Sequence, residues 1–338
     1  MCGKLDVRVE NVSIPQIEQP DDVLIQVHYT GICGSELHAI EGYEITAGTA
    51  VTENAHSPLG HEYAGVIAEV GPGVKHLTKG QRVTAWPRGP CGRCDMCRNS
   101  LHALCRKIAQ RGGSWAEYIV TPAPLVYALP DDISMAIGAI TEPLSCAVRI
   151  MDRAWMRAGQ TVAVIGAGPI GLFSAIMAKH AGAGLVIVSE PRKSRRLMAQ
   201  RMGADIVVDP LVENLHDIVM RHTMQRGVDI SIEAVGLEPA LSQAINIVGV
   251  GGTVIWGGVA PAGLRVPISP NDMFMREYTL RTSWGGLLEY DRTLRLERVI
   301  DWSPTAQEIF PLSQAMQAVN FSRTQAAGKV LLKTAAAD

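Results

Sequence analysis

The sequence carries little net charge. Its 338 residues include 31 lysines and arginines against 33 aspartates and glutamates, which gives a formal net charge of −2 at pH 7. Proteins that bind nucleic acid or an anionic membrane surface present a strongly basic patch or segment. We therefore expect neither nucleic acid nor a membrane as a partner.

The chain also shows no leader, internal repeat or low-complexity linker. Charged residues already occur within Met1–Arg8, where a secretory signal would need an apolar run. The uncharged run Thr161–Ala178 contains three glycines and a proline and is slightly short for a membrane span. Four of the seven cysteines are tightly spaced, which favours metal binding over disulfides. These features predict a cytoplasmic protein.

The length predicts two domains, because 338 residues exceed a single typical core. The segment up to about residue 130 reads as β-rich, with strands predicted at Asp22–His28, Tyr63–Val70 and Gln81–Trp86. Turns rich in glycine and proline separate these strands. Short strands of this kind favour a small, partly open barrel over a repeating βα unit.

A glycine-rich loop follows the apolar run Thr161–Ile165, which is typical of a buried parallel strand. Gly166, Gly168 and Gly171 have the G-x-G-x-x-G spacing and lead into a predicted helix. Such glycines permit a tight turn, a close approach to a pyrophosphate and close packing of the helix on the strand. The loop predicts a dinucleotide site, with a glycine-rich turn that binds nothing as the alternative.

Glu190 supports this prediction. It follows a second strand, Leu185–Ser189, and stands 19 residues after Gly171, where an acid that binds the ribose belongs. Four basic residues come next, interpreted as a solvated helix face with a 2′-phosphate anchor as the alternative: Arg192, Lys193, Arg195 and Arg196. Because Glu190 would repel a 2′-phosphate, NAD is favoured over NADP. Further strands at Ile206–Val208, Asp229–Glu233 and Thr253–Gly257 predict a doubly wound parallel sheet.

The strongest local signal is a set of four cysteines, Cys91, Cys94, Cys97 and Cys105. Four thiolates so close in sequence can surround one Zn²⁺ tetrahedrally and leave no open position, which indicates a structural site. The segment is poor in apolar residues, so metal rather than core burial should hold it folded. Four free cysteines in a loop are the alternative.

A second metal site is predicted from residues that are far apart in sequence. Cys33, His61, Glu62 and Glu142 together offer the mixture of ligands that a catalytic zinc uses. Taken singly, a cysteine or histidine at the edge of a β-domain is more often a core residue. Glu142 lies in an apolar stretch, where a carboxylate needs a metal or a cation.

The βα rhythm lapses from about residue 275. The sequence predicts a strand at Leu280–Trp284, a helix at Pro311–Val319 and a last strand at Gly328–Lys333. This tail is expected to complete the first domain. The predicted organisation is a zinc-binding catalytic domain of residues 1–149, completed by 276–338 and with a lobe at about 88–108, and a dinucleotide-binding domain of residues 150–275.

These motifs together resemble the zinc-dependent medium-chain dehydrogenase/reductase family, and most closely its polyol (sorbitol-like) and threonine dehydrogenase branch. The resemblance runs from Asp22 to Leu332. It rests on the four-cysteine lobe, the glycine-rich loop and the motifs Gly31-Ile-Cys-Gly-Ser35, Gly60-His-Glu62, Glu142-Pro-Leu-Ser145 and Glu233-Ala-Val-Gly236. It implies an α/β protein with a GroES-like β-rich catalytic domain, a doubly wound Rossmann domain and a homodimeric or homotetrameric assembly.

The resemblance also implies roles for individual residues. Cys33, His61 and a glutamate would hold the catalytic zinc, with Glu62 and Glu142 both candidates for the glutamate and Cys146 a weaker alternative. Ser35 would bond the zinc-bound alcohol, and His38 would pass its proton towards solvent. The implied cofactor-binding residues are Gly166, Gly168, Pro169, Ile170, Gly171, Glu190, Arg195 and Val235.

The predicted activity is reversible oxidation of a secondary alcohol, derived from a polyol, cyclitol or sugar, to a ketone with NAD and zinc. The alternatives are an amino-alcohol or sugar-1-dehydrogenase, a catalytically silent NAD-binding homologue and a quinone reductase without metal. Three departures from the family leave the substrate open: a short first strand, a long loop at Glu41–Pro58, and Arg281 in place of a smaller residue. Candidate pocket residues are Tyr43, Trp86, Arg281 and Trp284.

Overall fold

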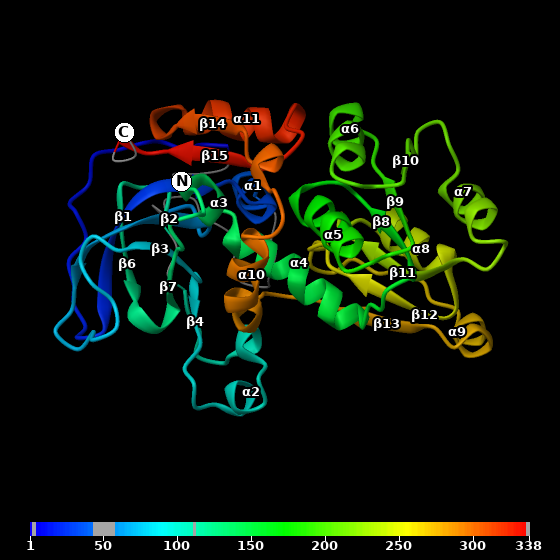
Figure 1. Cartoon of the computed structure of the whole chain (residues 1–338), viewed down its shortest axis with the longest axis horizontal. Coiled ribbons are helices and arrows are strands. Elements are labelled where there is room, and N and C mark those ends of the chain that lie inside the picture. Colours follow the sequence, from blue (N-terminus) through cyan, green and yellow to red (C-terminus); the bar gives the residue numbers. More distant parts are fainter. Residues whose placement is uncertain (2–4, 43–57, 111–112, 336–338) are drawn as a thin grey trace. The chain divides into compact units, whose positions relative to one another are not determined.

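The structure is a computed structural model that describes residues 1, 5–42, 58–110 and 113–335. These residues form two compact units, and Figure 1 shows the elements of each. The first unit contains the described residues up to Ser145 and those from Gly286 onward, and the second is Cys146–Gly285. The predicted boundary at 149/150 lies four residues after the one between these units, and the predicted boundary at 275/276 lies ten residues before the other. Among the described residues, no helix is long and apolar enough to cross a membrane.

The first unit is built mainly from strands. Its strands are β1 (Asp22–Gly31), β2 (Tyr63–Val70), β3 (Arg82–Ala85), β4 (Arg88–Gly89), β5 (Ala109–Gln110), β6 (Tyr118–Pro122), β7 (Val126–Ala128), β14 (Glu308–Pro311) and β15 (Val330–Lys333). Its helices are α1 (Gly34–Ile40), α2 (Asp95–Arg98), α3 (Met135–Gly138), α10 (Tyr290–Glu297) and α11 (Ala315–Thr324), and α4 (Thr141–Ala154) continues into the second unit.

Strand β1 organises the first unit's sheet, in the order β14-β15-β1-β2-β3-β7 with β6 also paired to β1. Val23, Ile25 and Val27 alternate along β1 and are fully buried, because side chains two residues apart share one face of a strand. They pack with apolar residues of β2 and β3. Strand β15 pairs antiparallel with β1, so the end of the chain completes this sheet.

The four-cysteine lobe is a short segment of the first unit that lies outside its main sheet. It begins with β4 and ends with β5, and these two strands pair antiparallel with Arg88 opposite Gln110. Between them lie only the single-turn helix α2 and a turn of 3₁₀ helix at His102–Leu104. The lobe thus has little regular structure of its own.

The second unit alternates strands and helices. Its strands are β8 (Thr161–Ile165), β9 (Leu185–Ser189), β10 (Ile206–Val208), β11 (Val228–Glu233), β12 (Val248–Trp256) and β13 (Thr279–Thr282). Its helices are α5 (Pro169–His180), α6 (Lys193–Arg201), α7 (Leu215–His222), α8 (Glu238–Ile247) and α9 (Pro270–Arg276).

All strands of the second sheet are parallel, in the order β10-β9-β8-β11-β12-β13 (Figure 1). Helix α5 packs against β8 and β9, and α8 packs against β11 and β12. The chain first moves from β8 towards β10 and then crosses to β11 on the other side of β8. Ligands of such sheets bind at the carboxyl ends of the strands where this reversal occurs, here between β8 and β11.

The strand predicted at Leu280–Trp284 is β13, and its place differs from the prediction. Instead of opening the returning tail, β13 pairs in parallel with β12, with Leu280 opposite Val254. The βα rhythm continues through α9, which begins at Pro270 and is capped by Ser269. The Ser269 hydroxyl accepts the N–H of Asp272 at 3.2 Å. At seven residues, α9 is too short to show a clear amphipathic period.

Candidate zinc and dinucleotide sites

The sulfur atoms of the four-cysteine lobe converge on one point. Distances between them include 3.5 Å from Cys94 to Cys97, 3.9 Å from Cys94 to Cys105 and 4.0 Å from Cys91 to Cys97. In a tetrahedral site with Zn–S bonds of about 2.3 Å, neighbouring sulfurs lie about 3.8 Å apart. A disulfide needs about 2 Å. The spacing therefore fits four thiolates around one zinc.

Backbone N–H groups donate hydrogen bonds to cysteine sulfurs of the lobe, which favours the thiolate form. The N–H groups of Cys97 and Arg106 lower the pKa of the Cys94 thiol to about 6. The Cys105 sulfur accepts the N–H of Cys91 at 3.2 Å and that of Lys107 at 3.4 Å. Burial, together with the neighbouring thiols of Cys94 and Cys105, instead raises the pKa of Cys97 to about 12. A metal would supply a cation that offsets the charge of its thiolate.

A second group of ligand atoms forms where β1 ends and β2 begins. Atoms of Cys33, His61 and Glu62 all lie within 4.8 Å of one another. Cys33 is the residue that precedes helix α1, and the His61–Glu62 pair directly precedes β2. Because β1 and β2 are neighbours in the sheet, residues about thirty apart in sequence meet at one edge. The predicted trio is thus brought together.

Glu36 fixes two members of this group, and the motif analysis did not single it out. One carboxylate oxygen pairs with His61 Nδ1, and the other accepts the backbone N–H of Cys33 at 2.7 Å. His61 Nε2 therefore remains for a metal, as in many zinc sites. Burial disfavours the charged imidazole, but Glu36 and Cys33 outweigh it and raise the pKa of His61. A glutamate three residues after a helix cap is the local signal that indicates this role.

Lys329 is the second residue that the motif analysis missed. Its Nζ lies 2.5 Å from the carboxylate of Glu62, and both side chains are almost completely buried. Gly31 makes room for this pair, because a Cβ there would lie 2.0 Å from Glu62 Oε2. No local pattern distinguishes Lys329 from a solvated lysine next to a final strand.

Glu142, at the start of α4, is not among the residues whose ligand atoms converge. Its side chain is buried, and burial raises its pKa to about 7. The carboxylates of Glu62 and Glu36 raise this pKa further, whereas the cations of His61 and Lys329 lower it. Glu142 thus belongs to the same charged neighbourhood, and its role as a ligand stays a prediction.

Ser35 and His38 lie in helix α1, directly after Cys33. They are three residues apart and therefore share one face of the helix. Both side chains are half-buried. The Ser35 hydroxyl and the His38 imidazole therefore follow one another along α1, which starts directly after the predicted ligand Cys33.

The glycine-rich loop links β8 to α5 at the carboxyl edge of the second sheet. Gly166 has φ = +87°, and a Cβ on Gly171 would lie 1.9 Å from the oxygen of Gly166. Gly168 precedes the helix, and Pro169 and Ile170 form its first turn. Pro169 has no N–H to satisfy there, and the other free N–H groups face outward as an anion site.

Glu190 lies beside this loop after β9 and is 3% exposed. Its carboxylate accepts the N–H of Ala167 at 2.8 Å and that of Arg192 at 2.9 Å. The guanidinium of Arg195 lies 3.8 Å from Glu190 and 3.5 Å from the position of a Cβ on Gly168. The predicted acid and one basic residue thus border the loop together.

Arg196, a second basic residue of this segment, contacts the fold itself rather than the loop. Arg196 donates to the backbone oxygens of Glu190 and Pro191 and forms an ion pair with Asp209 at 2.7 Å. It therefore stabilises the fold.

Val235, which follows β11, is 39% exposed and lies against Gly166.

The chain is similar to known proteins along most of its length. Residues 19–131 match the model of the alcohol dehydrogenase GroES-like domain, and residues 169–302 match that of zinc-binding dehydrogenases. It is 37% identical over 271 residues to D-xylulose reductase A of Aspergillus niger, covering 78% of this chain and 75% of that protein. The chain belongs to the zinc-dependent medium-chain dehydrogenase family.

Two solved structures of this family show how closely the fold agrees. Alcohol dehydrogenase TADH from Thermus sp. ATN1 is 30% identical with a TM-score of 0.89, covering 99% of this chain and 98% of that one. The 2R,3R-butanediol dehydrogenase from Bacillus subtilis is 27% identical with a TM-score of 0.86, covering 98% and 97%. The predicted family, fold class and enzyme class are confirmed. As a medium-chain dehydrogenase, the chain is an alcohol dehydrogenase that works with zinc and a nicotinamide cofactor.

The residues present fit the metal that the family implies. Both groups of ligand atoms combine thiolate with either further thiolates or imidazole and carboxylate, which are the ligands zinc prefers. The lobe offers four ligands and the second group offers three. The first set thus closes a tetrahedron, and the second leaves a position for a water or an alcohol.

Two of the four predicted pocket residues, Trp86 and Arg281, pack against other side chains. Trp86 is 3% exposed and meets the Tyr290 ring edge to face, with the ring centres 6.1 Å apart. Arg281 covers the ring of Trp155 at 3.2 Å and donates to the backbone oxygen of Arg153 at 3.2 Å. Trp284 is 45% exposed. Tyr43 and most of the loop at 41–58 lie outside the described residues.

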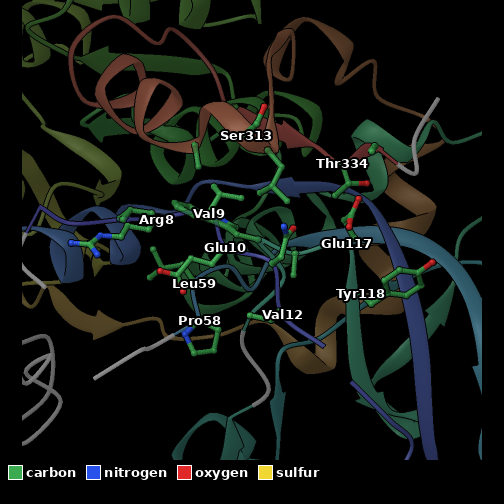
Figure 2. Close-up of a pocket in the computed structure, with 18 of the residues that line it drawn as sticks. Arg8, Val9, Glu10, Val12, Pro58, Leu59, Glu117, Tyr118, Ser313 and Thr334 are labelled. Carbon is green, nitrogen blue, oxygen red and sulfur yellow. The ribbon is translucent and has the colours of Figure 1, made fainter. Parts of the chain in front are cut away.

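The first unit also contains a large groove (Figure 2). Its volume is about 1060 Å³, and its walls are the extended segment Val7–Pro15, the start of β6, and the segment Ile309–Leu312. None of the predicted metal ligands lines it. The groove is therefore not the reaction site.

Proposed function

We propose that this dehydrogenase oxidises a secondary hydroxyl of a polyol to a ketone with NAD, and reduces the ketone in the reverse direction. The proposal rests mainly on the convergence of Cys33, His61 and Glu62 at the start of the helix that carries Ser35 and His38. A catalytically silent homologue has no need of a hydroxyl and an imidazole in this order.

Each residue of this site has a separate role in the proposed reaction. Cys33 and His61 hold the metal together with Glu62, and Glu142 is the alternative carboxylate. When bound, the zinc lowers the pKa of the substrate hydroxyl and the nicotinamide accepts the hydride. Ser35 accepts a hydrogen bond from that hydroxyl and orients it. His38, one turn further along α1, passes the proton towards solvent.

Glu36 and Lys329 each form an ion pair with one of the proposed ligands, His61 and Glu62 respectively. Glu36 holds the His61 ring in one tautomer, so its free nitrogen points to the metal. Lys329 offsets the charge of Glu62, so that a buried carboxylate does not stand alone beside the Cys33 thiolate. Lys329 would therefore keep the charge of Glu62 compensated whether or not Glu62 is a ligand.

NAD is the proposed cofactor. Glu190 borders the glycine-rich loop and carries the negative charge that would repel a 2′-phosphate. The phosphates would lie at the first turn of α5, with Pro169 and Ile170 beneath them and Val235 across Gly166. Arg195 favours the alternative, NADP, because its guanidinium lies at the same loop.

A polyol is the proposed substrate because D-xylulose reductase A is 37% identical to the chain. The deciding assay incubates the zinc-loaded protein with NAD or NADP and a panel of pentitols, hexitols, 2,3-butanediol and threonine. We expect reduction of NAD by a polyol, and NADH oxidation by D-xylulose. Turnover of threonine alone would indicate the amino-alcohol alternative, and no turnover with zinc present would indicate a silent homologue.

We also propose an oligomeric state and a cellular compartment for the protein, each from one further feature. Strand β13 ends the order of the described parallel strands, so its outer edge is open to a second copy in a homodimer or homotetramer. The four thiolates of the lobe need a reducing compartment, for which we propose the cytoplasm. Sedimentation and cell fractionation test these two points.

A further inference from the structure

We propose that Glu233 is a positioning residue of the nucleotide site: its buried carboxylate holds the loop after β11 so that Val235 covers the glycine-rich loop. The proposal rests on the proposed use of that loop for the dinucleotide. It concerns a residue that is a member of neither of the two metal groups. Glu233 is the last residue of β11, directly at the reversal point of the sheet.

The carboxylate of Glu233 closes a tight ring with its own backbone. Oε1 accepts the N–H groups of both Val235 and Gly236, each at 2.6 Å. The side chain is fully buried, so its carboxylate has these N–H groups rather than bulk water as partners. One oxygen atom thus determines the conformation of the residues that follow the strand.

The same residue also connects β11 to the end of β12. The backbone oxygen of Glu233 accepts the N–H of Gly257 at 2.8 Å and that of Gly258 at 3.0 Å. A Cβ on Gly258 would lie 2.4 Å from the nitrogen of Gly236 and 2.8 Å from Glu233 Oε2. The ends of two strands and the loop between them are therefore packed around one carboxyl group.

This arrangement reaches the phosphate loop through two contacts. Ala234 donates its N–H to the backbone oxygen of Ile165 at 2.9 Å, at the end of β8. A Cβ on Gly166 would lie 2.5 Å from Cγ2 of Val235, so the valine occupies the space that the glycine leaves open. Because Val235 remains 39% exposed, it presents an apolar surface at the place where the dinucleotide binds.

A carboxylate suits this position better than an apolar residue. Burial raises the pKa of Glu233, and the N–H groups of Gly236, Val235 and Gly258 lower it. An apolar side chain would leave the N–H groups of Val235 and Gly236 unpaired. The loop would then find other hydrogen bonds by moving, and Val235 would move with it.

The test compares Glu233→Asp with Glu233→Gln in the zinc-loaded full chain. Aspartate withdraws the acceptor oxygen by one carbon–carbon bond, whereas glutamine keeps an oxygen in the place of Oε1. We expect the dissociation constant for NADH, measured by fluorescence well below the unfolding temperature, to rise roughly tenfold for Glu233→Asp and less than about threefold for Glu233→Gln. Ser231→Ala is the matched control, because Ser231 is buried two residues earlier in β11 and its hydroxyl has no partner among the described residues.

A second variant keeps the proposal testable if Glu233→Asp does not fold. Val235→Ala leaves the carboxylate intact and is expected to weaken NADH binding by a similar factor. Hydrogen exchange at the Gly236 amide should accelerate in Glu233→Asp and remain slow in Val235→Ala. These results would distinguish the role of Glu233, which fixes the loop conformation, from the role of Val235, which contacts the dinucleotide.

Two outcomes would overturn the proposal, and they differ from each other. If Glu233→Asp or Val235→Ala binds NADH as tightly as the wild type, Glu233 has a structural role alone, even if the unfolding temperature falls. If the wild type binds neither NADH nor NADPH, the dinucleotide site itself is wrong and the proposed function fails with it.

Discussion

The ammonium nitrogen of Lys329 lies 2.5 Å from the carboxylate of Glu62, and the two residues are 267 positions apart in the chain. Neither side chain is more than 1% exposed. Removing one partner of such a pair leaves a buried charge without compensation, whereas removing both does not. This asymmetry leads to the first prediction.

Lys329→Met is expected to lower the free energy of unfolding of the metal-free protein by about 3–5 kcal/mol. The double variant Lys329→Met/Glu62→Gln should lose clearly less, because no bare carboxylate remains. Urea unfolding in the presence of a chelator measures both. An equal loss in the single and double variants would show that the pair contributes through packing rather than charge.

Cys94→Ser is expected to remove one of two zinc ions from the protein. The Cys94 sulfur is close to those of both Cys97 and Cys105, and backbone N–H groups lower its pKa to about 6. Arg98→Ala is the control, because Arg98 is an exposed residue of the same lobe outside the four-cysteine group, and this variant should retain both ions. Metal analysis of the purified proteins gives the answer, and two zinc ions in Cys94→Ser would contradict the assignment.

Glu36→Gln is expected to weaken zinc binding at the second site roughly 10- to 100-fold, as is usual when the partner of a ligating histidine is lost. The amide can accept the N–H of Cys33, but it holds His61 Nδ1 less strongly than a carboxylate does. Competition with a chromophoric chelator measures the affinity. The lobe zinc should be unaffected and serves as the internal reference.

Glu297 gives stability a pH dependence. Burial raises its pKa from 4.5 to about 8, with a small opposing effect from Thr141. Because the folded state holds this proton more tightly than the unfolded state, Glu297 reduces stability progressively as the pH rises from about 4.5 to about 8.

Glu297→Gln removes this dependence. Relative to the wild type, the variant should gain stability between pH 5 and pH 8, by on the order of 4 kcal/mol at the upper end. Urea unfolding at the two pH values measures the gain. Glu69→Gln, on an exposed position of β2, should change neither slope nor stability. A gain that is the same at both pH values would contradict the proposed titration.

Gly166→Ala is expected to weaken NADH binding at least tenfold. The new Cβ would meet Cγ2 of Val235 at 2.5 Å, and the backbone has φ = +87°. Gly159→Ala separates these two causes, because Gly159 has φ = +86° and its Cβ would meet nothing within 4 Å. Similar binding in the wild type and Gly166→Ala would show that the valine is free to move aside.

The sequence alone determined the features that depend on nearby residues. The spacing of Cys91, Cys94, Cys97 and Cys105 is local, so four sulfurs converge whatever the rest of the chain does. The same holds for the glycine-rich loop, since its turn and its helix start follow from φ angles and the lack of a Cβ. The limits of strand β2 are predictable for a similar reason, because its short apolar run lies between Glu62 and Gly71.

Only the tertiary structure decided which distant groups meet. Lys329 pairs with Glu62 because β15 lies beside β1, and that pairing depends on sheet register rather than on any pattern around residue 329. Strand β13 joined the second sheet because β12 offered it an edge, which a short strand preceded by a short helix does not reveal. Local sequence fixes local geometry, whereas long-range pairing follows from the burial and hydrogen bonding of the whole chain.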